Sequence, residues 1–76
     1  MKADELKQAF DGWGITAAQG AKVLCLHSNK LSEYLGGVER IPCALAFSVE
    51  ALGLLDGEVR QALFTRRLAH KAHGAD

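Results

Sequence analysis

The stretch of sequence that decides the fold runs from residue 14 to residue 37 and reads GITAAQGAKVLCLHSNKLSEYLGG. Its first half predicts a short helix, because Thr16 is a good N-cap and the apolar or small residues that follow recur at helical spacing. These residues are Ala17, Gly20, Ala21 and Leu24. The small residues among them indicate that another helix crosses closely at Gly20 and Ala21, since glycine inside a helix otherwise costs about 1 kcal/mol relative to alanine.

The second half of this stretch predicts another short helix. Ser28 is its candidate N-cap, Leu31, Tyr34 and Leu35 lie on one side, and the pair Gly36–Gly37 ends it. Only residues 25–27 separate the two helices. A turn of three or four residues between two short helices is the spacing of a helix-turn-helix.

Three further helices flank this pair. The first begins near Ala3 and ends near Gly12–Gly14, the fourth begins at Pro42, and the fifth spans about residues 57–72 with Asp56 as its cap. For the fourth helix we expect a buried stripe that Phe47 and Leu54 broaden. No segment shows sustained alternation with a period of two. The sequence therefore predicts an all-α fold: a small five-helix bundle containing a helix-turn-helix, in a single domain that covers residues 1–76.

Composition limits the classes of function. The chain has 76 residues, 49% hydrophobic and 24% charged, and its nine basic and nine acidic side chains give no formal net charge. This balance excludes a disordered chain and a polybasic protein that binds through bulk charge. The N-terminus resembles no export signal and no segment is long and apolar enough to span a membrane, so we expect a cytoplasmic protein without membrane contact.

The basic residues are unevenly distributed. The segment 59–75 contains four of them and no acid: Arg60, Arg66, Arg67 and Lys71. This segment is suited to contact phosphate or an anionic partner. It is equally consistent with a solvated helix whose positive charges stabilise its C-terminal end.

The residues that could carry chemistry are few. Cys25 and Cys43 lie in apolar neighbourhoods and form no Cys-x-x-Cys pair, so we expect buried free thiols rather than a disulfide or a zinc site. His70 and His73 are interpreted as solvated histidines near the C-terminus. The glycine pattern at residues 12–17 lacks the preceding strand that a dinucleotide site requires. We expect no catalytic residues, no metal site and no cofactor.

At this point residues 13–42 resemble the Cro/Xre-type helix-turn-helix of bacterial and phage repressors, including regulators associated with anti-CRISPR operons. The resemblance rests on Thr16 as the cap, Ala21 at the helix crossing, Gly37 after the second motif helix, and Ile41–Pro42 at the start of the next helix. Apolar residues at Leu24, Leu26 and Leu31 also match. The motif covers about half of the chain.

The chain departs from this family at two positions. Ala17 stands where the family commonly has a glutamine that holds a phosphate or orients the recognition helix. Cys25 stands in the turn where glycine is usual, and we therefore expect a less strained turn.

The resemblance implies a sequence-specific DNA-binding transcriptional regulator, a repressor or autoregulator, that places the helix 28–35 in the major groove of double-stranded operator DNA. Asn29 is suited to pair with adenine, Lys30 with guanine or phosphate, and Glu33 either to accept from cytosine or to repel phosphate. The expected DNA-binding residues are Lys22, Ser28, Asn29, Lys30, Ser32, Glu33 and Arg40, of which Lys22 and Arg40 would contact the backbone.

One such unit offers few base contacts, so we expect a homodimer over two half-sites. The fifth helix is the expected dimerisation element, because a small core has little room for its apolar residues together with the fourth helix. The residues concerned are Val59, Leu63, Phe64 and Leu68.

A helix-turn-helix-shaped protein-interaction module that does not read DNA is the alternative, either a phage inhibitor or an antitoxin-like protein with a protein partner. Residues 13–16 and 60–64 are similar to Xre/ParS-type antitoxins. An exposed apolar patch around residues 28–33, in place of a polar or basic face, would favour this alternative.

Overall fold

The computed structural model describes residues 1–69, and five α-helices are the regular elements of that part of the chain. They are α1 (Ala3–Trp13), α2 (Ala17–Val23), α3 (Ser28–Leu35), α4 (Cys43–Leu54) and α5 (Gly57–Ala69). The expected all-α class and the expected order of five helices are confirmed. The fifth helix was expected to continue to residue 72. Its last three residues lie outside the described residues, and so do the two histidines near the C-terminus, His70 and His73, and the basic residue Lys71.

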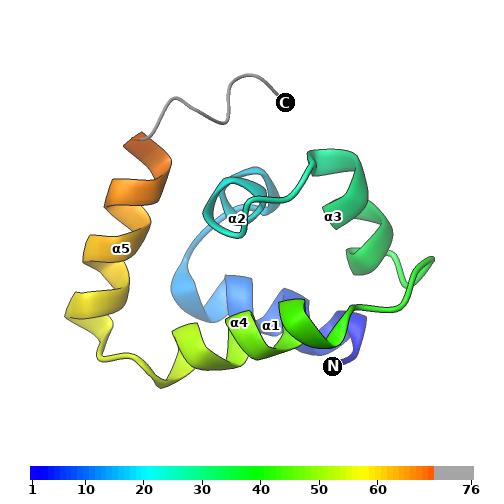
Figure 1. Ribbon diagram of the computed structural model, residues 1–76, viewed down its shortest axis with the longest axis horizontal. Helices are drawn as coiled ribbons and strands as arrows, with labels where there is room; N and C mark the ends of the chain where they lie inside the picture. The colour runs from blue at the N-terminus through cyan, green and yellow to red at the C-terminus, as the bar shows by residue number, and fades with distance from the viewer. Residues whose placement is uncertain (70–76) are drawn as a thin grey trace.

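The helices form a small open arrangement with α2 at its centre (Figure 1). In this view α4 runs along the lower edge, α5 stands at the left and α3 at the right. The helix α2 packs against both α3 and α5, while α1 packs against α3 and α4. The core therefore lies where α1, α3 and α4 meet, and α5 is attached mainly through α2.

The apolar faces predicted from the spacing of α1 and α3 form this core. Leu6 and Phe10 of α1 meet Leu31 and Tyr34 of α3, and each of these four side chains is buried. The other buried members of the cluster are Ala21, Ile41, Leu45 and Val49. Burial of this set is the main stabilising contribution, as expected for a domain of this size.

The close crossing that Gly20 and Ala21 predict is confirmed. A Cβ atom on Gly20 would lie only 2.5 Å from Cζ of Phe10, and Ala21 is itself buried. Because Phe10 is held in the core, its ring has little freedom to move away. The glycine lets α2 rest directly on the Phe10 ring of α1.

Three consecutive helices end in the same hydrogen-bonding pattern, which places the next segment each time. A residue in the left-handed conformation follows each helix: Gly14 (φ 72°), Cys25 (φ 60°) and Gly37 (φ 76°). After each one, the next amide donates to the carbonyl oxygen five residues earlier, which belongs to Phe10, Ala21 and Glu33 respectively. This is the Schellman arrangement, which satisfies the last free carbonyls of a helix.

The helix starts expected at Thr16 and Pro42 agree with the structure, and the one expected at Ser28 does not. The Oγ1 of Thr16 accepts from the amide of Gln19 at 3.1 Å, and the side chain of Gln19 accepts from the amide of Thr16 at 2.9 Å. Pro42 precedes α4, as expected. The assignment of Ser28 as an N-cap was wrong, because Ser28 is already helical and His27 occupies the cap position in an extended conformation.

Trp13 joins α5 to the rest of the molecule. Its ring lies 5.4 Å from the ring of Phe64 and 6.1 Å from that of Phe10, measured between centroids. The guanidinium of Arg60 lies over the same indole and donates to the carbonyl oxygens of Leu52 (3.3 Å) and Leu55 (3.0 Å) at the end of α4. Arg60 therefore caps α4 from α5.

We predict that Gly20→Ala destabilises the protein by roughly 1–2 kcal/mol, because overpacking against Phe10 exceeds the gain in helix propensity. The matched control is Gly12→Ala in α1, where a new Cβ meets nothing within 4 Å and should stabilise by up to about 1 kcal/mol. Urea unfolding monitored by circular dichroism measures both. A Gly20→Ala variant at least as stable as Gly12→Ala would show that the contact has room to relax.

Candidate nucleic-acid interface

The helix α3 presents one polar face to solvent because its opposite face is anchored in the core. Leu31 is only 1% exposed and Tyr34 is also buried. At 100° per residue, Asn29 and Glu33 lie directly opposite these anchors and one turn apart from each other. Ser28 and Ser32 flank this line on the side of α2, and all four side chains are exposed.

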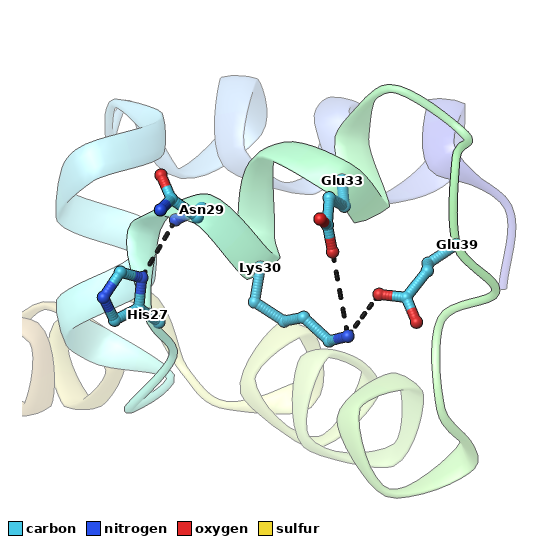
Figure 2. Close-up of polar contacts among 5 residues, drawn as sticks. All are labelled: His27, Asn29, Lys30, Glu33 and Glu39. Carbon is cyan, nitrogen blue, oxygen red and sulfur yellow. Dashed lines mark hydrogen bonds and ion pairs between the residues drawn. The ribbon is translucent and has the colours of Figure 1, made fainter.

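Lys30 lies on the other flank of α3 and is held by two carboxylates. Its Nζ donates a hydrogen bond to Oε2 of Glu39 and lies 3.7 Å from Oε1 of Glu33. Figure 2 shows the ammonium between these two acids, one from α3 and one from the loop that follows it. The Tyr34 ring centroid lies 5.8 Å from the same nitrogen.

This ion pair shifts both titrations. The hydrogen bond to Glu39, with the charges of Glu39 and Glu33, raises the pKa of Lys30, and the hydrogen bond from Lys30 lowers the pKa of Glu39. The contribution of Glu39 is lost as the pH falls through its lowered pKa, and that of Lys30 as the pH rises through its raised pKa. The pair is therefore intact throughout the neutral range.

The left-handed Gly37 is the reason that Glu39 reaches Lys30. After α3 the chain reverses, and the amides of Val38 and Glu39 both donate to the carbonyl oxygen of Glu33, at 3.0 and 3.4 Å. The reversal brings the Glu39 carboxylate beside the helix it has just left. Sequence reasoning missed this contact, because the two residues are nine positions apart and only the turn brings them together.

At the start of α3, the imidazole of His27 acts as the cap. Its Nδ1 accepts a hydrogen bond from the backbone amide of Asn29 at 3.3 Å (Figure 2). The Asn29 amide is thereby satisfied within the chain, and its side chain is left on the exposed face.

A shallow hollow of about 210 Å³ lies between the start of α2 and α3. It is lined by Ala17, Ala18, Ser28, Leu31, Ser32 and Leu35. The two alanines are exposed at the N-terminal end of α2, so the floor of this surface is apolar and its polar groups are two serine hydroxyls.

The other two expected DNA-binding residues lie outside α3. Lys22 is exposed on α2, and Arg40 is exposed in the loop before α4. All seven expected residues are therefore exposed, five of them on α3, with Lys22 on α2 and Arg40 in the loop before α4. The assignment of a DNA-binding role to them stays a prediction.

The turn between α2 and α3 differs from its expected form. Cys25 adopts a left-handed φ of 60°, which is sterically unfavourable for a residue with a side chain. The expectation of a less strained turn was therefore wrong. The Cys25 thiol is exposed and accepts a hydrogen bond from Nη2 of Arg67. Cys43 is exposed as well, at the start of α4. The expectation that the two cysteines are buried was therefore wrong.

Two of the basic residues of α5 make structural contacts with other parts of the chain. Arg60 caps α4, and Arg67 donates to Cys25 across the turn that precedes α3. Arg66 is exposed in the last described turn of α5. Of the four basic residues in segment 59–75, two thus hold neighbouring elements within the chain.

The residues expected at a dimer interface separate into different environments. Phe64 is 1% exposed and packs on Trp13, so it belongs to the core of a single chain and is not on its surface. The reasoning that the core cannot bury Phe64 was wrong, because Trp13 provides its cover. Leu63 and Leu68 are half-buried and Val59 is 53% exposed. Dimerisation itself stays a prediction.

Large apolar side chains are exposed at positions that the sequence reading assigned to the interior. Phe47 is 70% exposed and Leu54 is 83% exposed, although both were expected to broaden the buried stripe of α4. The other large exposed apolar residues in the described part of the chain are Met1, Val38, Leu55 and Val59. None of the six lies on α3.

Comparison of the chain with protein-family models, with curated proteins and with solved structures gave no significant match. Within residues 1–69, no group of three or more His, Cys, Asp or Glu side chains is placed to hold a metal ion. No helix in the described part of the chain is long and apolar enough to cross a bilayer.

We predict that Cys25→Gly is more stable than Cys25→Ala by about 1 kcal/mol, because only glycine adopts the left-handed conformation without a steric cost. Both variants remove the thiol that Arg67 contacts, so the comparison isolates the backbone. Chemical denaturation of the two variants under reducing conditions gives the difference. Equal stabilities would mean that the turn relaxes when the thiol is removed.

Proposed function

We propose that this protein is a sequence-specific DNA-binding regulator, in which α2 and α3 act as a helix-turn-helix and α3 enters the major groove of double-stranded DNA. The observation that carries this proposal is the exposed face of α3. It is a polar face, anchored by Leu31 and Tyr34, and none of the large exposed apolar side chains of residues 1–69 lies on it. The resemblance of residues 13–42 to Cro/Xre-type repressors supports the same interpretation.

The side chains of this face are suited to read base edges. Asn29 carries a donor and an acceptor for bidentate pairing with adenine, and Glu33 is an acceptor for the amino group of cytosine. The serines at 28 and 32 and the alanines at 17 and 18 are small, so they would let the helix approach the groove closely. Alanine is also a suitable contact for a thymine methyl group.

The electrostatics of the surface indicate modest affinity for DNA of arbitrary sequence. The expected DNA-binding residues include three cations, Lys22, Lys30 and Arg40, and both Glu33 and Glu39 form ion pairs with Lys30. Each phosphate contact contributes about 0.9 to the slope of log affinity against log salt. With Lys30 held by two acids, we expect a shallow slope and specificity that depends on base contacts.

The alternative function, a protein-interaction module that uses the same face, is less well supported. Such a module would present large apolar side chains on α3, where the exposed residues are polar. The large exposed apolar side chains of the described residues lie mainly on α4 and at its junction with α5, with Met1 at the N-terminus and Val38 in the loop after α3.

Duplexes enriched from a random-sequence pool provide the test, with affinity measured by fluorescence anisotropy. We predict that Asn29→Ala weakens binding to the enriched duplex by about 1–3 kcal/mol, roughly 5- to 150-fold, while binding to a scrambled duplex changes little. Glu39→Gln should tighten binding to both duplexes and steepen the salt slope by about one, because it releases the Lys30 ammonium.

The matched control for charge is Asp11→Asn, which removes one acid from the exposed side of α1. It should change affinity and salt slope less than Glu39→Gln does. Failure to enrich any sequence, or equal binding by Asn29→Ala and the unmodified protein, would refute the proposed role of α3.

A further inference from the structure

The hollow between α2 and α3 adjoins the face of α3 that is proposed to read DNA. Ser28 and Ser32 form part of its lining, and Asn29 is exposed on the same helix. Asn29 and Ser32 are three positions apart, so they are neighbours on the helix surface. A base pair contacted by Asn29 would therefore have its neighbouring base pair beside the hollow.

The lining of this hollow is mostly hydrocarbon. Leu31 is buried and Leu35 is half-buried, while Ala17 and Ala18 contribute their methyl groups from the start of α2. None of the six lining residues carries a charge, and the polar side-chain groups among them are the two serine hydroxyls. Such a surface favours an apolar group that leaves water and offers no counter-charge to a phosphate.

The size of the hollow limits what it can receive. Its volume of about 210 Å³ is below the roughly 300–1,000 Å³ of pockets that enclose a drug-sized molecule. The hollow is also shallow, because its deepest residue, Leu31, already belongs to the core. It can therefore accept a small group that projects from a larger surface, and it cannot enclose a free ligand.

One group in the major groove of DNA has these properties. Thymine is the only one of the four standard bases that presents a methyl group there, and its O4 acceptor lies next to that methyl group. The alkyl lining suits the methyl group, and a serine hydroxyl at the edge can donate to O4. Cytosine carries an amino group and no methyl group, so it would leave the hollow unfilled.

We propose that this hollow is a specificity-determining site that takes the C5-methyl group of one thymine for each bound copy of the chain. The inference rests on the proposed function of α3 and adds the base that is selected beside the Asn29 contact. Ala17 and Ala18 keep the hollow open, because a longer side chain at either position could occupy the space that the methyl group needs. Ala17 thereby acquires a role in base selection in place of the phosphate contact that a glutamine would make.

Replacement of thymine by deoxyuracil in the enriched duplex tests the inference with the unmodified protein. This change deletes the methyl group and leaves every hydrogen-bonding group of the base pair in place. Each thymine is replaced in turn, and affinity is measured by fluorescence anisotropy. We expect the replacement to weaken binding about fourfold at one thymine of each bound site, the effect of one buried methyl group, and less than about twofold at the other thymines.

A variant that fills the hollow locates the methyl group on the protein. Ala18→Leu places a larger side chain there, and the matched control is Ala51→Leu, the same change at an exposed position of α4. We expect Ala18→Leu to bind the thymine duplex more weakly and to lose the fourfold response to uracil, whereas Ala51→Leu keeps that response. Ala18→Val fills less of the hollow and provides the same comparison if Ala18→Leu does not bind. Circular dichroism establishes that each variant is folded.

The outcomes separate this inference from the proposed function. An enriched sequence that contains no thymine, or that tolerates uracil at every thymine, would overturn the inference and leave the DNA-reading role of α3 standing. A response to uracil that persists unchanged in the folded Ala18 variants would place the methyl group outside the hollow and would overturn it as well. Failure to enrich any sequence would overturn both proposals together.

Discussion

The rest of the structure depends on the contact between the backbone of Gly20 and the ring of Phe10. It brings α2 onto α1 at a distance that no larger residue allows, and α2 in turn holds α3 on one side and α5 on the other. The exposed face of α3 is therefore positioned by packing in which its own polar residues take no part. Because the exposed residues of α3 take no part in this packing, they can be replaced by other polar residues without changing the fold.

Short-range physical chemistry predicted most of the fold. The five helices, the Thr16 cap, the close crossing at Gly20 and the role of Gly37 follow from residues within one or two turns of each other. The errors involve contacts between distant parts of the chain. Phe64 is buried because Trp13, fifty-one positions earlier, provides its cover, and the outer face of α4 is exposed although its sequence is typical of a buried helix. No local pattern distinguishes a helix covered by its own chain from one that a second molecule would cover.

The candidate site shows the same division. The exposed positions of α3 follow from its helical period and were predicted correctly as surface residues. The ion pair between Lys30 and Glu39 was not predicted, because Glu39 is brought beside Lys30 only by the reversal of the chain at Gly37. The zero net charge of the chain thus has a local counterpart at the proposed interface, where acids offset part of the basic charge. In this account, affinity for DNA comes from base contacts and from pairing of two chains more than from bulk attraction to phosphate.

The central claim is that the polar face of α3 reads DNA. The most direct measurement is the change in backbone amide chemical shifts of isotope-labelled protein on titration with an enriched duplex. The account predicts that the shifts concentrate at residues 28–33, with smaller changes at Lys22 and Arg40, and that the exposed face of α4 is unaffected by the duplex. Shifts centred on α4 or on Arg66 of α5, with residues 28–33 unchanged, would contradict it.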